Sequence, residues 1–190
     1  MGAFYTSHTL RGPSRDDLLA WLADRDAFVS TTQRSLTTIL DAACESQDVR
    51  ELADLAKRLS AHFQCPVLAV LNHDDDILYF ELYERGEKTD EYNSSPAYFS
   101  DDAGGPNEPV GGNANRLAAV FESDDAAAIE FILRKPSSDY VFQTQRHRDL
   151  AAALGLPGFS VGVGYNYAQA DHATPGIPKG TYVLTPRVKR

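Results

Sequence analysis

Residues 66–92 read PVLAVLNHDDDILYFELYERGEKTDEY, and this stretch decides the fold of the chain. The apolar run from Pro66 to Leu71 is bounded by turn residues, which is typical of a strand buried on both faces. In the run from Ile77 to Tyr83, apolar and polar side chains alternate, which predicts a second strand with two different faces. One face carries Leu78, Phe80 and Leu82, and the other carries Tyr79, Glu81 and Tyr83. After a turn, the chain continues into a third run that ends at Tyr92.

Patterns that precede this stretch predict the order β-α-β-β-α-β for the first half of the chain. Strands are expected over Ala3–Leu10, Ala27–Thr31 and Leu36–Leu40. Helices are expected after the capping residues Ser14 and Asp48. This order is that of a split βαβ, ferredoxin-like sandwich, in which helices pack on an antiparallel sheet. We therefore predict an α+β fold.

The second half of the chain has the character of a helical addition to that sheet. We divide the sequence into a sheet-forming half (1–93), a loop rich in Gly and Pro (94–113), a helical addition (114–168) and a tail (169–190). The apolar residues Tyr182–Leu184 are the part of the tail that we expect to be held in place. With 190 residues and 43% hydrophobic content, the chain is long enough for one α+β domain with its own core.

The formal net charge of −9 is concentrated in one window, residues 72–108. This window holds eleven acids and two bases, so it accounts for the whole net charge, and the rest of the chain is neutral. An acidic face disfavours nucleic acids and anionic membranes and favours a basic partner or a cation. The sequence contains no apolar run long enough for a transmembrane helix. Partners are therefore expected among basic proteins.

Tyrosines are interleaved with these acids, as in an interface core that is rimmed by charge. The candidate binding residues are Tyr79, Glu81, Tyr83, Asp90, Tyr92 and Tyr98. The alternative is that the tyrosines pack under the C-terminal helices and that the acids are only solvated. The sequence leaves both interpretations open.

The polar tip His73-Asp74-Asp75-Asp76 is the candidate for metal binding. Three carboxylates and an imidazole are ligands for hard cations or transition metals. However, Asn and Asp are preferred turn residues, and the spacing of a calcium loop is missing. We therefore expect a hairpin turn and no metal, with His73, Asp74 and Asp76 as the ligands if a metal binds. A metal-dependent hydrolase centred on this tip is the alternative function.

The segment GFSVG at 158–162 matches the nucleophile-elbow pattern, but it lacks the strand-to-helix context and the later Asp and His of that motif. We interpret it as a close-packing segment, and over 158–167 the pattern fits either a helix or a strand.

We find no cofactor motif and expect no cofactor. Cys44 and Cys65 are too few for a disulfide scaffold, and the start of the chain does not resemble a signal peptide. Both observations favour the cytoplasm.

The segments LAVLNHDDDILYFELYE, DEYNSSPAYF and ALGLPGFSVGVGYNY resemble a family of uncharacterised bacterial proteins. The resemblance covers most of the chain but implies no activity and no catalytic residues. From the residues themselves, we expect a non-catalytic cytoplasmic binding protein of the inhibitor or immunity type, which uses its acidic, tyrosine-rich surface to engage a basic partner.

Overall fold

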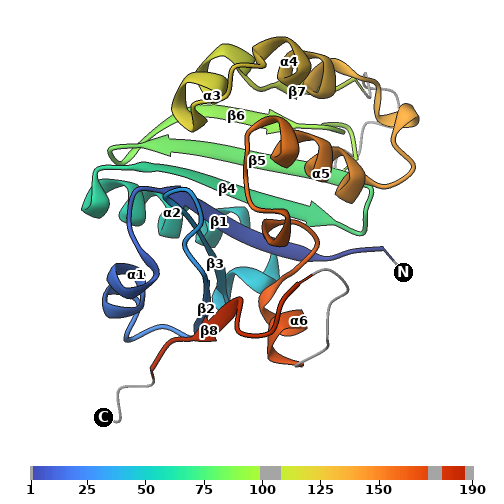
Figure 1. Ribbon diagram of the computed structural model, residues 1–190. Coiled ribbons are helices and arrows are strands. Elements are labelled where there is room, and N and C mark those ends of the chain that lie inside the picture. The colour runs from blue at the N-terminus through green and yellow to red at the C-terminus, as the bar shows by residue number, and fades with distance from the viewer. Residues whose placement is uncertain (1, 99–107, 171–176, 187–190) are drawn as a thin grey trace.

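The structure, a computed structural model, describes residues 2–98, 108–170 and 177–186 (Figure 1). Its strands are β1 (Tyr5–Arg11), β2 (Ala27–Ser30), β3 (Leu36–Asp41), β4 (Pro66–His73), β5 (Ile77–Glu84), β6 (Glu87–Asn93), β7 (Val110–Gly111) and β8 (Tyr182–Leu184). Its α-helices are α1 (Arg15–Trp21), α2 (Val49–Phe63), α3 (Ala114–Phe121), α4 (Ala126–Arg134), α5 (Gln143–Ala153) and α6 (Tyr165–Gln169). Short 3-10 helices are η1 (Ala43–Ser46), η2 (Ser137–Asp139) and η3 (Gly158–Ser160).

These strands form one antiparallel sheet in the order β7-β6-β5-β4-β1-β3-β2-β8. The α+β class with an antiparallel sheet is therefore confirmed. In the interior of the sheet, Val70 of β4 pairs with Phe80 of β5, and Leu68 pairs with Leu82. Every residue from Val67 to Leu71 is at most 4% exposed. The prediction that this run is an interior strand is confirmed.

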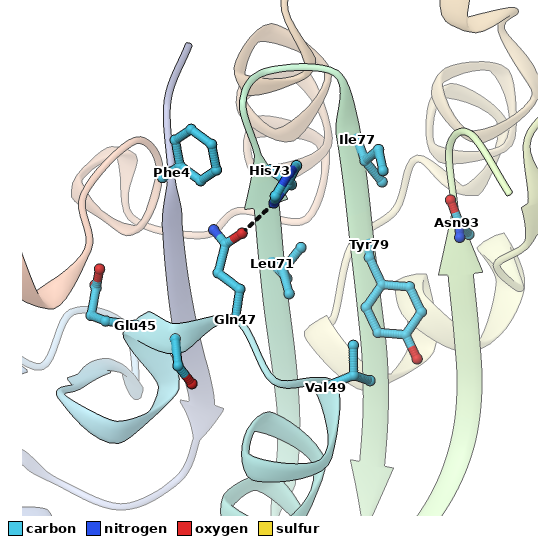
Figure 2. Close-up of a pocket in the computed structure, with 10 residues that line it drawn as sticks. Phe4, Glu45, Gln47, Val49, Leu71, His73, Ile77, Tyr79 and Asn93 are labelled. Atoms are coloured by element: carbon cyan, nitrogen blue, oxygen red, sulfur yellow. Dashed lines mark hydrogen bonds between the residues drawn. The ribbon is translucent and has the colours of Figure 1, made fainter. Parts of the chain in front are cut away.

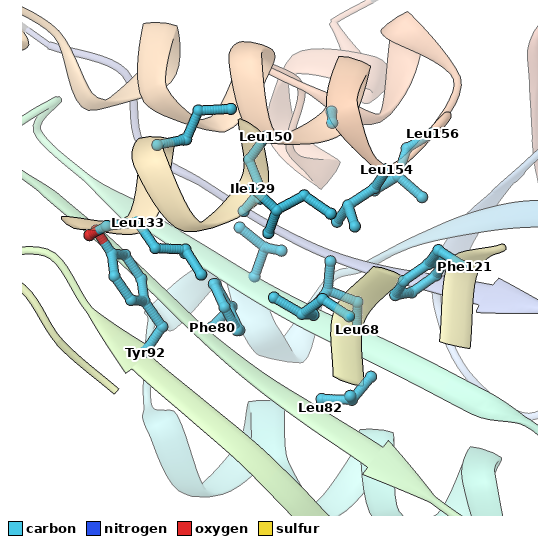
Figure 3. Close-up of a cluster of buried hydrophobic side chains, with 14 of the residues drawn as sticks. Leu68, Phe80, Leu82, Tyr92, Phe121, Ile129, Leu133, Leu150, Leu154 and Leu156 are labelled. Carbon is cyan, nitrogen blue, oxygen red and sulfur yellow. The ribbon is translucent and has the colours of Figure 1, made fainter. Parts of the chain in front are cut away.

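Helices cover both faces of the sheet, which explains why the apolar run of β4 has no polar face (Figure 1). On one face, α1 and α2 bury leucines such as Leu18 and Leu55 against β4. On the other face, α3, α4 and α5 cover Phe80 and Tyr92 with Leu133 and other apolar side chains (Figure 3). None of the helices described is long and apolar enough to cross a membrane.

The first half of the chain has the expected β-α-β-β-α-β order, and β1 lies between β3 and β4. The helices α1 and α2 pack on the same face of the sheet. The sheet is wider than this unit, however, because β5, β6 and β7 extend it beyond β4 and β8 extends it beyond β2. The ferredoxin-like description of this half stays a prediction.

The C-terminal segments complete the sheet rather than forming a separate unit. In the tail, Tyr182–Leu184 forms β8 and pairs with β2, so that Val183 lies opposite Val29. The guanidinium of Arg15 donates to the carbonyl of Thr181 at 2.6 Å and fixes the start of this strand. The undecided segment 158–167 forms η3 and the start of α6. The expected loop 94–113 contains β7, and its residues 99–107 lie outside those described.

Two buried histidines lie between the sheet and its helices. The hydroxyl of Tyr5 and Nδ1 of His147 are 2.7 Å apart, and burial lowers the pKa of His147 to about 3. His8 donates from Nε2 to the carbonyl of Leu52 at 3.0 Å, and burial lowers its pKa as well. Both imidazoles are therefore neutral in the fold at neutral pH.

The Val70→Asp substitution tests the interior position of β4. An unpaired carboxylate beside Phe80 costs several kcal/mol, which is comparable with the whole stability of a domain, so we expect an unfolded chain. Circular dichroism and urea titration measure this. The matched control is Val110→Asp, because Val110 is 48% exposed on β7 and a surface change there shifts stability by only about 0.5 kcal/mol. A soluble Val70→Asp protein with a cooperative transition would contradict the assignment.

Acid should destabilise the fold through His147. The folded protein takes up a proton at His147 only near pH 3, whereas the unfolded chain takes one up near pH 6.5. Between these values the unfolded state binds more protons, so the free energy of unfolding falls as the pH is lowered. In His147→Gln, which cannot take up that proton, we expect a shallower slope, by up to about 1.4 kcal/mol per pH unit. Urea titrations between pH 4 and pH 7.5 compare the two slopes, and equal slopes would contradict this role of His147.

Candidate functional site

The turn between β4 and β5 projects from one end of the sheet, close to the N-terminus (Figure 1). Its central residues, Asp74 and Asp75, have φ values of 50° and 62°, and the amide of Asp76 donates to the carbonyl of His73 at 2.9 Å. Two consecutive positive φ values are typical of the tight hairpin turns that match the twist of the strands. Asn and Asp tolerate this conformation better than other side chains with a Cβ. The expectation of a hairpin turn is confirmed.

Asp75 connects this turn to two other parts of the chain. One carboxylate oxygen accepts from the amide of Ala3 at 2.9 Å, and the other accepts from the amide of Thr144 at 3.1 Å and from the Thr144 hydroxyl. Its backbone carbonyl accepts from the amide of Gln143 at 2.8 Å. The residue that precedes α5, Phe142, has no side-chain cap of its own. Asp75 therefore caps α5 from a distant point in the sequence.

The other polar side chains of the tip bind separate partners. Asp74 accepts from the amide of Gly2 at 2.7 Å, and Asp76 accepts from the hydroxyl of Tyr98 at 3.1 Å. His73 donates from Nδ1 to Oε1 of Gln47 at 2.6 Å. Among the described residues, no group of three His, Cys, Asp or Glu side chains is arranged to hold a metal ion. Adjacent turn residues diverge, so the candidate ligands His73, Asp74 and Asp76 are not brought together around one point.

A groove of about 590 Å³ opens beside the turn, on the face of the sheet that α2 covers farther along (Figure 2). Leu71 and His73 of β4 and Tyr79 of β5 line its floor, while Phe4 and Val49 stand at its sides. The groove exists because α2 begins only at Val49. The part of the sheet between this helix start and the β4–β5 turn is therefore not covered by α2. Its volume is in the range of ligand pockets, and its lining is mainly apolar with a few polar groups.

Aromatic rings form a row across the outer end of the groove. The rings of Phe4 and His73 meet edge to face, with centroids 4.8 Å apart, and those of His73 and Tyr98 do so at 6.0 Å. Phe4 is 49% exposed, Tyr98 is 45% exposed, and Val49 on the opposite wall is 41% exposed. We call the lining residues Phe4, Val49, His73 and Tyr79, together with Tyr98, which contacts His73 from outside the lining, the groove set. Exposed apolar side chains that gather in one place mark interaction sites.

The floor of the groove continues into a buried network around Glu81. Its carboxylate accepts from the hydroxyl of Tyr79 at 2.8 Å, from that of Tyr83 at 2.9 Å, and from the ammonium of Lys88 at 3.0 Å. Burial and the bonds to Glu81 raise the pKa of both phenols, which keeps them protonated as donors. Glu81 is only 3% exposed and Tyr83 only 6%. The expectation that these two side chains form an open surface is therefore wrong, because α2, Tyr79 and Lys88 cover them.

Two further candidates lie on the opposite side of the sheet. Tyr92 is fully buried, and its hydroxyl donates to the carbonyl of Leu133 at 3.1 Å and accepts from Arg146 at 2.6 Å. For Tyr92, the alternative that the tyrosines pack under the C-terminal helices is correct. Asp90 accepts from the amide of Asn113 at 2.7 Å, just before α3. Neither side chain contributes to the groove.

Of the six candidate binding residues, the structure brings Tyr79 and Tyr98 to the groove region, and Glu81 lies beneath Tyr79. The sequence interpretation missed Phe4, Gln47 and Val49, which come from the segments before β1 and before or at the start of α2. The only local signal is that Val49 is a large apolar residue next to the cap Asp48. The position of Phe4 and Val49 beside β4 follows from the strand order, which periodicity does not give.

Comparison of the whole chain with known proteins finds no match among family models, curated proteins or solved structures. The resemblance to uncharacterised bacterial proteins stays a prediction. The case for a function therefore depends on the geometry of the groove and of the turn beside it.

The pair Asp75→Asn and Asp74→Asn tests whether Asp75 caps α5. Asn keeps the positive φ at either position but replaces one accepting oxygen with a donor. In Asp75→Asn, the single remaining oxygen can accept either from the amide of Ala3 or from the two donors of Thr144, but not from both residues. We therefore expect the free energy of unfolding to fall by about 2 kcal/mol. Asp74 accepts one bond, from the amide of Gly2, which the remaining oxygen of Asn can keep, so we expect a loss of about 0.5 kcal/mol or less. Urea titration at pH 7 compares the two variants, and equal losses would contradict the capping role.

Proposed function

We propose that this chain is a non-catalytic binding protein that engages a basic protein partner through the groove set. The observation that carries the proposal is the open groove of about 590 Å³ whose apolar floor and walls come from separate segments of the chain. An uncovered apolar sheet face in a folded protein is costly unless something binds there. The aromatic and aliphatic side chains of this groove suit one apolar anchor residue of a partner.

The negative charge around the groove supports a partner whose anchor residue is surrounded by basic residues. The exposed acids near the opening are Asp48, which caps α2, Asp76 at the tip and Glu91 on β6. Glu91 also binds Lys88, so part of its charge is balanced within the chain. Acids at the rim of an interface mainly raise the association rate of a basic partner, while anchors in the centre slow dissociation.

The groove also supports binding rather than a reaction. Its hydroxyl and imidazole groups already bind within the chain: Tyr79 donates to Glu81, and His73 donates to Gln47. The raised pKa of Tyr79 keeps its hydroxyl protonated at neutral pH, so it is not available as a general base. An inhibitor or immunity-type protein, which neutralises a basic partner by occupying it, fits these features.

A displayed peptide library tests this proposal with the intact chain as bait. We expect enriched peptides to share one large apolar residue flanked by Lys or Arg. Calorimetry with an enriched peptide should show at least a tenfold weaker affinity for Phe4→Ala and for Val49→Ala, since truncating an anchor contact costs more than about 1.4 kcal/mol. Asp76→Asn should mainly slow association, and this effect should vanish at high salt.

The matched control is Val183→Ala, because Val183 is 38% exposed on β8, at the other edge of the sheet. This variant should bind the peptide as the unchanged chain does. Enrichment of acidic peptides would contradict the proposal, and so would an unchanged affinity in Phe4→Ala and Val49→Ala. A library without any enriched sequence would count against it as well.

A further inference from the structure

A second cavity, of about 570 Å³, lies on the other side of the β4–β5 turn. It opens between the start of α5, the segment around η3 and the residue Ile177 that leads to β8. Its lining includes the side chains of Asp75, Phe142, Thr144, Arg148, Val161 and Ile177. The groove set lies on the face of the sheet that α2 covers, so this cavity is a different site.

The walls of the cavity combine apolar side chains with the polar residues Asp75, Thr144, Gln145 and Arg148. Phe142 is 56% exposed even though it is a large aromatic residue, and Val161 and Ile177 supply further apolar surface. Gly158 and Gly162 also line the cavity, and a Cβ at Gly158 would meet no atom within 4 Å. The backbone there leaves room for a ligand. A cavity of this size that joins an apolar wall to convergent polar groups suits a small molecule with an apolar and a polar end.

Arg148 is the cationic group of the cavity. It is exposed on α5, and among the described residues no carboxylate lies within ion-pair distance of its guanidinium. The other charged residue in the lining, Asp75, already accepts from Ala3 and from both donors of Thr144. Its carboxylate is therefore held by the turn and by α5, and it does not pair with Arg148.

Ser160 is a buried polar residue in the segment that borders the cavity. It lies in η3, between the lining residues Gly158 and Val161, and is only 1% exposed. Its hydroxyl has no hydrogen-bond partner within the part of the chain that the structure describes. A buried hydroxyl without a partner is costly, and an ordered water is the usual group that satisfies it.

We propose that this cavity binds a small organic acid, with its apolar body between Phe142, Val161 and Ile177 and its carboxylate on Arg148. A guanidinium binds a carboxylate through two parallel hydrogen bonds, which fixes the orientation of the ligand as well as adding affinity. The ligand class is a monocarboxylate with an aromatic or branched apolar body. The negative charge of this ligand is opposite to the positive charge of the partner proposed for the groove set.

Phenylacetate, 2-phenylethylamine and 2-phenylethanol serve as probes, because they share an aromatic body and differ in charge. Each is titrated into the intact ¹⁵N-labelled chain up to about 10 mM, which covers weak, fragment-like affinities. We expect phenylacetate to bind saturably and to shift the amide signals of Gly158, Val161 and Gly162. The alcohol should bind at least tenfold more weakly, and the amine should cause no saturable shift.

Arg148→Gln should weaken phenylacetate at least tenfold and leave the alcohol unchanged, because only the charged contact is lost. The matched control is Arg50→Gln, which removes an arginine whose side chain is 94% exposed on α2 and should leave phenylacetate binding unchanged. Thermal unfolding shows that each variant folds. Equal binding of the acid and the amine, an unchanged affinity in Arg148→Gln, or no binding by phenylacetate at all would overturn the proposal.

Discussion

The carboxylate of Asp75 is the interaction on which both candidate sites depend. It lies at the tip of the β4–β5 turn and holds the amide of Ala3 and both donors of Thr144, so three segments that are far apart in sequence meet there. On one side this fixes Phe4 next to His73, and on the other side it fixes the start of α5. The carboxylate of Asp74 adds a bond to the amide of Gly2, and the amide of Asp75 donates to the carbonyl of Ala3, so the turn holds the terminal segment through several bonds. The geometry of each opening therefore depends on this half-buried carboxylate between them.

Coverage by helices explains why the openings occur at this end of the sheet. Along most of β4, α2 packs on one face and α5, with its neighbours, on the other. Near the turn, α2 has not yet begun and α5 is only starting, so both faces of the hairpin are incompletely covered. A sheet whose middle is fully buried and whose end is not places apolar side chains at the surface without weakening the core. The exposed apolar surface and the residues that stabilise the core are thereby separated in space.

Much of the fold was predictable from the sequence because the strands and helices carry strong periodic signals. The buried run of β4, the alternation in β5 and the caps Ser14 and Asp48 each report a local environment. The candidate site was only partly predictable, because its residues come from segments that meet through the strand order. The alternation of apolar and polar side chains in β5 identified Tyr79 as a candidate. Such alternation predicts which face of a strand a side chain lies on, but it does not predict which helix covers that face. Phe4, Val49 and Arg148 carried no local signal of what they would lie beside.

The acidic window shows why charge in a sequence differs from charge on a surface. All of the net charge of −9 falls within residues 72–108, which predicts a strongly acidic face. In the fold, several of these acids bind donors within the chain: Glu81 binds Tyr79 and Lys88, Asp75 binds Thr144, and Glu84 binds Arg116. Such carboxylates stabilise turns and strand contacts, and their charge is partly balanced. In the proposed interface, exposed acids such as Asp76 lie at the rim and mainly affect the association rate, whereas the apolar groove contributes the affinity.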